Sequence, residues 1–284
     1  MDVGNILLIV LFFATIAHLL SLKVCSVTLD HRTAPLFISG WTLLGLLGAA
    51  PFFGHLWTEG QDIFIAHPML LALAMAKGML LYLLFVISQQ LMQVSLSSRH
   101  YVTPLTIGFM AVINSFLGEN LTPQQWAGCL GLFALAVGFF FKGHLSELSS
   151  PSRLAYGKLV ALGVTLGVMD HFLTGKTNWF SLLLVSNITL FVFSLALNYR
   201  NVPLLKAAFL HKSAAIAGLF YMTAELLKFY QQVSINPVSV VVTVQALTKP
   251  VILMLSALIW QERTVREQMI WGGLAFVATL PLFF

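Results

Sequence analysis

Ten apolar stretches, most of them about twenty residues long, follow one another along the chain with short polar breaks between them. An α-helix rises about 1.5 Å per residue, so about twenty apolar residues are needed to cross the hydrocarbon core of a bilayer. The stretches predict membrane-spanning helices at residues 3–23, 34–55, 68–94, 99–118, 123–142, 154–174, 177–197, 206–232, 237–260 and 267–284. Helices of this number and length use nearly the whole chain, so no soluble domain fits beside them.

The composition supports lipid as the solvent of this chain. Of its 284 residues, 58% are hydrophobic and only 9% are charged, and the mean hydropathy is +0.90. A soluble domain carries roughly a quarter charged residues, so a soluble fold of this chain would expose apolar surface that it could not hide from water. We therefore expect an all-α integral membrane protein that crosses the cell (inner) membrane several times.

Several chemistries are not indicated by the sequence. Cys25 and Cys129 are the only cysteines and both adjoin apolar runs, which excludes a disulfide framework or a multi-cysteine metal site. Gly-rich phosphate loops and the HExxH and GxSxG motifs are missing as well. We expect a protein that is not an enzyme and has no catalytic residues, no cofactor, no metal site and no nucleic-acid partner.

The longest polar break falls near the middle of the chain. It reads KGHLSELSSPSR, and its glycine, serine and proline residues are typical of a linker. This break predicts a first five-helix repeat at residues 1–142, a linker at 143–153 and a second five-helix repeat at 154–284.

The two predicted halves share polar residues without a gap between the third and eighth apolar stretches. The matched pairs are Tyr82 with Tyr221, Gln93 with Gln232, Val94 with Val233 and Ser95 with Ser234. Further on, Glu119 and Gln125 are echoed by Glu262 and Gln268 at the same spacing. Because five helices per half is an odd number, the second half must enter the membrane from the opposite side. Such inverted repeats place a binding site at their interface, near the bilayer midplane.

The eighth stretch carries the most polar residues. Tyr221, Glu225, Lys228 and Gln232 follow an i, i+4, i+7, i+11 spacing, which puts all four on one helical face. A charge at the bilayer centre costs at least about 2.5–3.5 kcal/mol, so this face must meet water or partner groups. One interpretation is a cavity wall in which Glu225 binds substrate and exchanges a proton. The alternative is a neutral structural pair of Glu225 with Lys228, three residues apart.

Lys249 lies deep within the ninth stretch, with Gln245 on the same face. Pro250 removes a backbone donor and frees carbonyl groups beside the lysine. Interrupted helices next to a charged group are common at transporter substrate sites, so we predict that Lys249 and Gln245 bind substrate. A structural pair with Glu225 is the alternative.

Residues of other stretches complete the predicted site or are given structural roles. Tyr82 and Gln89 of the third stretch share a face and are expected to bind substrate opposite Tyr221. Lys77 lies off this face, and we interpret it as a structural residue that pairs elsewhere. His18 is expected to be a hydrogen-bonded core residue, and Asp170 to belong to a polar helix end rather than a proton relay.

Two segments carry a resemblance to a known family. They are GENLTPQQWAGCLGLFALAVG at residues 118–138 and PVILMLSALIWQERTVREQMIWGG from Pro250 onward, one in each half. The pattern resembles the drug/metabolite transporter superfamily in its ten-helix EamA-like form. That resemblance implies a central cavity surrounded by helices one to four and six to nine, with Glu119 and Glu262 as loop or helix-start residues.

The second copy departs from the family pattern, because Gln261 stands where the family has a glycine. In the first copy, Pro104 lies too far upstream of Glu119. The later FYQQVS…PVS…K residues also resemble sugar-phosphate and nucleotide-sugar translocators, which implies that Lys249 meets an anionic group.

Together these patterns predict a secondary active transporter that moves a small polar metabolite through alternating access. Lys249 favours an anionic metabolite. An exporter of amphipathic cations that relies on Glu225, a flippase for lipid-linked sugar, a membrane-embedded enzyme and a subunit of a complex are the alternatives. The expected partners are the lipid bilayer and a small-molecule substrate, and the chain is expected to be a monomer or a homodimer.

The basic residues of the loops predict an orientation. Ten spans place almost all of them on one side of the membrane, against Lys176 on the other. The residues on the first side are Lys23, Arg32, Arg99, Lys142, Arg153, Lys158, Arg200, Lys206, Arg263 and Arg266. Because basic loops stay in the cytoplasm, both termini should lie outside it, although the EamA-like family is usually drawn with both inside.

If both termini lie outside the cytoplasm, alkaline phosphatase fused to the C-terminus should be active, and green fluorescent protein at either end should stay dark. A fluorescent fusion would indicate the opposite orientation.

Overall fold

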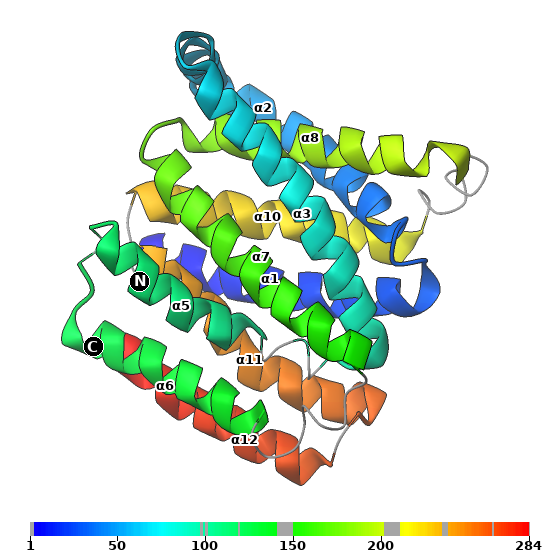
Figure 1. Cartoon of the computed structure of the whole chain (residues 1–284), viewed down its shortest axis with the longest axis vertical. Helices are drawn as coiled ribbons and strands as arrows, with labels where there is room; N and C mark the ends of the chain where they lie inside the picture. The colour runs from blue at the N-terminus through cyan, green and yellow to red at the C-terminus, as the bar shows by residue number, and fades with distance from the viewer. Residues whose placement is uncertain are drawn as a thin grey trace. The chain divides into compact units, whose positions relative to one another are not determined.

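The computed structural model describes residues 3–96, 99, 102–118, 120–140, 150–201, 211–234, 238–262 and 264–283 (Figure 1). Within these ranges the chain forms ten α-helices and no strand, which confirms the all-α fold class. The helices are α1 (Val3–Thr28), α2 (Ala34–Ala66), α3 (Pro68–Val94), α5 (Val102–Phe116), α6 (Pro123–Phe139), α7 (Ser150–Thr174), α8 (Trp179–Asn198), α10 (Lys212–Ser234), α11 (Val238–Trp260) and α12 (Val265–Thr279).

Each predicted stretch overlaps one helix, but several predicted ends were wrong. The first helix continues to Thr28, and α2 continues to Ala66 instead of ending at residue 55. The polar residues that suggested a loop there, such as Glu59 and Asp62, lie within α2. Pro51 lies inside this helix, and Phe53 has non-helical dihedrals, so α2 is bent rather than ended at this point.

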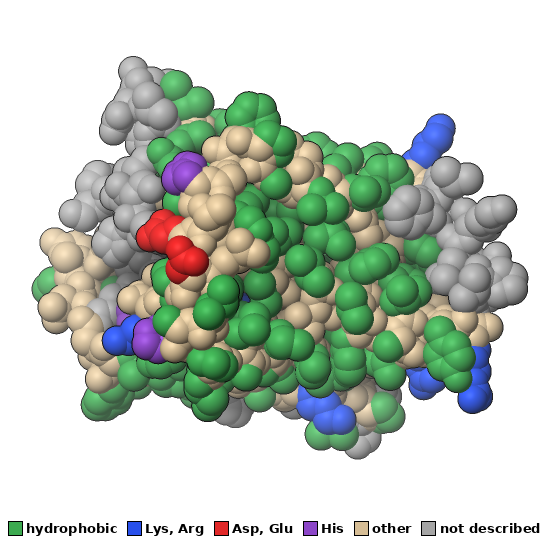
Figure 2. Space-filling model, turned by 90° about the horizontal axis from the view of Figure 1, so that it is seen from above, with side chains coloured by type: hydrophobic (Ala, Val, Ile, Leu, Met, Phe, Trp, Pro, Cys, Tyr) green, Lys and Arg blue, Asp and Glu red, His purple; other side chains and the backbone are tan. Residues whose placement is uncertain are grey.

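Four helices of the described residues are long and apolar enough to cross a membrane. They comprise Ile6–Thr28, Ala34–Ala66, Pro68–Val94 and Trp179–Asn198. Large apolar side chains lie on the outside of the molecule, among them Phe52, Ile65 and Phe116, of which Phe116 is 88% exposed. Figure 2 shows hydrophobic side chains spread over the visible face, with charged side chains mainly toward its margins. An apolar exterior of this kind suits contact with lipid, as expected of a membrane protein.

The chain divides into two compact units, and each takes helices from both sequence halves. Unit 1 consists of Met1–Gln90 and Met169–Asn236, and unit 2 of Leu91–Val168 and Pro237–Phe284. In unit 1, α10 packs against α1, α2 and α8, and α2 also packs against α8 (Figure 1). In unit 2, α6 packs against α5 and α12, and α11 packs against α12 and, over a smaller area, against α5 and α6.

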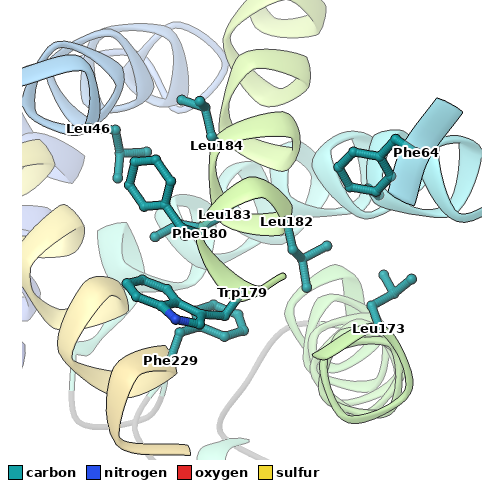
Figure 3. Packing of buried hydrophobic residues seen from close by; sticks show 10 residues of the cluster. Leu46, Phe64, Leu173, Trp179, Phe180, Leu182, Leu183, Leu184 and Phe229 are labelled. Atoms are coloured by element: carbon teal, nitrogen blue, oxygen red, sulfur yellow. The ribbon is translucent and has the colours of Figure 1, made fainter. Parts of the chain in front are cut away.

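The core of unit 1 is a cluster of buried aromatic and aliphatic side chains. At the start of α8, Trp179 and Phe180 belong to one packed cluster with Leu46 of α2, Leu173 of α7 and Phe229 of α10 (Figure 3). Burial of a large side chain of this type contributes about 1.5–3 kcal/mol where water is the alternative. Because Phe229 belongs to α10, the cluster fixes the helix that carries Glu225 and Lys228.

The segments with family resemblance form helix starts. In α6, the side chain of Thr122 accepts a hydrogen bond from the backbone N–H of Gln125, and the Gln125 side chain accepts one from the backbone of Thr122. In α12, the side chain of Thr264 accepts from the backbone N–H of Glu267. The equivalent cap in the second copy is therefore Thr264 with Glu267, one residue earlier than the match of Gln125 with Gln268 predicts.

Gly218 allows a close approach between two helices of unit 1. A Cβ atom at this position of α10 would lie 2.5 Å from the backbone oxygen of Ile38 and 2.7 Å from the Cβ of Trp41, both on α2. The Thr42 hydroxyl donates a hydrogen bond across the same contact, to the Gly218 oxygen at 3.0 Å. Small residues at such contacts are typical of helix packing in membranes.

We expect Gly218→Ala to lower the stability of the purified protein by about 1–3 kcal/mol, because the new methyl group overpacks the contact between α10 and α2. Thermal unfolding in detergent measures this as a lower Tm. Gly48→Ala in α2 is the matched control, because a Cβ atom there meets nothing within 4 Å. An equal Tm for the two variants would contradict the close contact.

Candidate functional site

Four charged side chains form a continuous ion-pair network in unit 1. On α10, Lys228 donates a hydrogen bond from Nζ to Oε2 of Glu225 at 2.6 Å. The same Nζ lies 3.6 Å from Oδ2 of Asp170, on α7. The other oxygen of Asp170, Oδ1, lies 2.5 Å from Nζ of Lys77, on α3. The order of charges is therefore Lys77, Asp170, Lys228 and Glu225, and the network as a whole is neutral.

This network is withdrawn from the surface. The Lys77 side chain is 3% exposed, and the side chains of the other three residues are 12–15% exposed. Ions removed from water lose several kcal/mol of hydration each, which their mutual attraction must offset. The ammonium groups of Lys77 and Lys228 also lie 4.7 and 4.6 Å from the centre of the Phe229 ring. One aromatic ring therefore stabilises both cations of the network.

Tyr221 lies one helical turn before Glu225, in contact with two other rings. Its ring centre is 5.1 Å from that of His18, on α1, and 5.3 Å from that of Phe85, on α3. Nδ1 of His18 lies 2.9 Å from the backbone oxygen of Ala217. A carbonyl oxygen only accepts, so Nδ1 carries the hydrogen in this bond. His18 is thus a hydrogen-bonded core residue, as the sequence predicts.

Tyr82 and Gln89 both belong to α3 and are buried. Tyr82 packs edge-on against Phe193 of α8, with 5.5 Å between ring centres. The Gln89 side chain is fully buried, and neither its amide nitrogen nor its oxygen has a hydrogen-bond partner in the described part of the chain. The same is true of Gln231 on α10. Buried amides without partners are rare in folded proteins and indicate a place for water or a ligand.

A second polar cluster lies in unit 2, around Lys249. This lysine is 5% exposed, and its Nζ donates a hydrogen bond to Oγ1 of Thr103, on α5, at 3.0 Å. Nη1 of Arg99 lies 3.5 Å from the same hydroxyl oxygen. Arg99 precedes α5, and burial lowers its pKa to about 10, while the nearby Tyr156 opposes that shift. Its guanidinium group therefore stays protonated at neutral pH.

The structure brings together part of the predicted site. Glu225 and Lys228 pair directly, as their spacing predicts, and Tyr221 lies next to them on α10. Tyr82 and Gln89 belong to the same unit as these residues, whereas Lys249 belongs to unit 2. The Gln245 side chain lies outside the described residues. A single binding site that joins Lys249 to Glu225 remains a prediction.

Some residues were missed or undervalued by the sequence analysis. Asp170 was assigned to a polar helix end, yet its carboxylate bridges Lys77 and Lys228. Arg99 was counted only among the basic loop residues and Thr103 was not assigned to the site, yet Lys249 and Arg99 both donate to the Thr103 hydroxyl oxygen. The sequence signal that could have identified the role of Asp170 is charge balance, because a deep lysine such as Lys77 requires an acid on a neighbouring helix. Glu262 was expected to be a loop or helix-start residue, but the N-cap of α12 is Thr264. The Glu262 carboxylate instead accepts hydrogen bonds from the Leu96 N–H at 2.8 Å and the Ser95 hydroxyl at 3.2 Å, which follow α3.

Comparison of the chain with models of protein families and with curated proteins finds no match. Its function must therefore be inferred from the two polar clusters themselves.

We expect Asp170→Asn to destabilise the protein more than Glu225→Gln does. Loss of Asp170 removes the carboxylate shared by two lysines, and an unpaired buried charge costs about 3–5 kcal/mol. Loss of Glu225 leaves Lys228 still paired with Asp170. Thermal unfolding of the purified variants measures the difference, with Asp62→Asn, at an exposed position of α2, as the neutral control. The opposite ranking of the first two variants would contradict the bridging role of Asp170.

Proposed function

We propose that this chain is a multi-pass secondary active transporter of a small polar metabolite and works by alternating access. The observation that carries this proposal is the ion-pair network of Lys77, Asp170, Lys228 and Glu225 inside apolar helices. Ionisable residues within membrane spans are costly, and they commonly line substrate or proton pathways. A purely structural core is formed at lower cost by apolar side chains, which can replace buried ion pairs without loss of stability.

Helix packing supports an inverted-repeat architecture of the drug/metabolite transporter type. If residues 1–142 and 154–284 are repeats, α2 corresponds to α8, α5 to α11 and α6 to α12. Each of these pairs is in contact within a compact unit. Contact between equivalent helices is what a two-fold pseudo-symmetry axis between the halves produces. On the strength of the same contacts between equivalent helices, we include membership in the EamA-like family in this proposal.

Within the proposed site, the network contributes a proton acceptor. Asp170 lies between two lysines, whereas Glu225 has one partner in the network, Lys228. Protonation of Glu225 therefore breaks one ion pair and leaves the contacts of Asp170 with both lysines in place. Glu225 is the member of the network that can exchange a proton with the least rearrangement, and Tyr221 lies one turn away from it.

The substrate-binding groups are distributed over several helices. In our proposal Tyr221, Glu225, Tyr82 and Gln89 bind polar groups of the substrate, and Lys249 with Gln245 neutralises its charge. The unpartnered amide of Gln89 supports this assignment, because a substrate hydroxyl group can donate to its oxygen and a substrate hydroxyl or carbonyl oxygen can accept from its nitrogen. Export of an amphipathic cation is the main rival, and it predicts that activity survives neutralisation of Lys249.

Transport is tested with purified protein in liposomes that contain a pH-sensitive dye. We expect external addition of a transported metabolite, found by screening carboxylic acids, amino acids and sugar phosphates, to acidify the lumen of protein-containing liposomes. Glu225→Gln should abolish proton movement, because an amide cannot exchange the proton, and Lys249→Ala should abolish uptake of an anion. Lys158→Ala, at an exposed position of α7, should keep full activity.

Access of water to the site gives a second measurement that needs no known substrate. In a variant with Cys25→Ala and Cys129→Ala, a cysteine introduced by Gln89→Cys should react with a charged, membrane-impermeant thiol reagent from either side. Leu83→Cys, at an exposed apolar position of the same helix, should face lipid and stay unreactive. A position 89 that is inert from both sides, in a protein without flux, would reject the proposed function.

A further inference from the structure

Helix α7 belongs to both compact units. Its residues up to Val168 are part of unit 2, and those from Met169 onward are part of unit 1. Asp170 lies within one helical turn of this boundary, and it provides the carboxylate that Lys77 and Lys228 share. The ion-pair network therefore includes the end of a helix whose other turns belong to unit 2.

Unit 2 holds the first part of α7 through two glycines. A Cβ atom at Gly163 would lie 3.0 Å from the hydroxyl oxygen of Thr106, on α5. A Cβ atom at Gly167 would overlap the side chain of Met110, one turn further along α5. Contacts this close leave little room for α7 to slide along α5, so a displacement of the far end of α7 is passed on to unit 2.

Unit 1 holds the last turn of α7 in two ways. Leu173 is fully buried in the aromatic cluster around Trp179. The Asp170 carboxylate lies 2.5 Å from Nζ of Lys77 and 3.6 Å from Nζ of Lys228. Hydrogen bonds between nitrogen and oxygen measure about 2.7–3.2 Å, so the pair with Lys77 is in full contact and the pair with Lys228 is not. The link from α7 to α10 is therefore an ion pair that has room to shorten.

Lys228 divides its charge between carboxylates on two helices. Its Nζ donates to Oε2 of Glu225 at 2.6 Å, and this bond lies within α10, whereas the pair with Asp170 joins α10 to α7. A proton on Glu225 removes its negative charge and with it most of its attraction for Lys228. Asp170 is then the remaining carboxylate of the network, and a movement of about 0.8 Å brings it into hydrogen-bond contact with Lys228.

We infer that Asp170 is a positioning residue that couples proton uptake by Glu225 to the end of α7. When Glu225 takes up a proton, Lys228 turns from Glu225 to Asp170 and draws the last turn of α7 toward α10. Because α7 continues into unit 2, which contains Lys249, the proton acts on the unit that in our proposal neutralises the substrate. The inference rests on the proposed role of Glu225 as the proton acceptor and adds the residue through which that proton acts.

The other titratable and charged groups around Glu225 do not offer the same route. Lys77, on α3, stays paired with Asp170. Tyr221 lies one turn away on α10 itself, and His18 of α1 packs against the Tyr221 ring. No ion pair joins Glu225 to α2 or α8 in the described part of the chain. Among the residues described, the bridging lysine alone connects Glu225 to another helix through ion pairs.

Double-mutant cycles on the purified, full-length protein test the inference. Asp170→Asn and Lys228→Met are made singly and together, once in the wild-type protein and once with Glu225→Gln, which keeps position 225 neutral. Thermal unfolding in detergent gives the non-additive part of the Tm loss, which measures the coupling of the two residues. We expect this part to be about twofold larger or more with Glu225→Gln, because Lys228 then forms a charged hydrogen bond with Asp170. An equal or smaller value would overturn the inference, because it would show that Lys228 does not turn to Asp170.

Hydrogen–deuterium exchange keeps the test decisive if Asp170→Asn does not fold. At one fixed pH, Glu225→Gln alone should slow exchange of the backbone amides at residues 169–174 severalfold, because the end of α7 is held more tightly. Asp170→Glu keeps the carboxylate and should preserve this response, whereas a carboxylate that merely neutralises Lys77 gives no response. Asp62→Asn, at an exposed position of α2, is the matched control and should leave this exchange unchanged. Unchanged or faster exchange with Glu225→Gln would overturn the inference.

Neither measurement depends on flux. Transport in liposomes together with unchanged exchange at residues 169–174 would reject the role of Asp170 and leave the proposed function standing. A normal response to Glu225→Gln in a protein without flux would reject the proposed function and retain the coupling of Glu225 to α7.

Discussion

The cost of charge inside apolar helices governs the rest of this structure. Lys77, Asp170 and Glu225 lie in helices whose other residues are mostly apolar, and each needs an opposite charge close by. Lys228 meets that need twice, because it pairs with Asp170 and Glu225 together. The packing of α3, α7 and α10 in unit 1 must satisfy these pairs, which leaves few arrangements for the three helices.

The aromatic core and the ion pairs constrain each other through one residue. Phe229 belongs to the buried cluster around Trp179 (Figure 3). Its ring also lies beside the ammonium groups of Lys77 and Lys228. An aromatic ring is apolar enough to pack in the core, and its face still attracts cations. Phe229 thus lets the charged network border directly on the hydrophobic core.

Sequence reasoning predicted the helices well, because each is a continuous apolar run and the breaks between runs are short. It failed at α2, because the run after Pro51 contains Glu59 and Asp62, and these polar residues resemble a loop when only the sequence is seen. Helical spacing also predicted the pair of Glu225 and Lys228, which is local. It did not predict that Asp170 joins Lys77, because the two are far apart in the chain. Spacing within one helix carries no information on which face of another helix it meets.

The same limit applies to Thr103, whose hydrogen bond with Lys249 spans a long sequence separation. Lys249 itself was recognisable, since a lysine in the middle of an apolar helix is costly wherever it packs. A single deep cation shows that a polar site exists, but the sign and number of its neighbours decide what that site binds. Only the folded chain brings the second cation and the hydroxyl group together.

The proposed roles of Glu225 and Lys249 determine which gradients across the membrane can drive transport. In the proposed mechanism, a proton carried on Glu225 and an anion of unit charge neutralised by Lys249 have opposite charges, so their joint movement transfers no net charge across the membrane. The membrane potential, worth about 2.3 kcal/mol per elementary charge at 100 mV, then neither drives nor opposes the step. The pH gradient and the concentration gradient of the anion remain as driving forces. The proposed roles of Glu225 and Lys249 are therefore suited to electroneutral coupling of a proton with an anion.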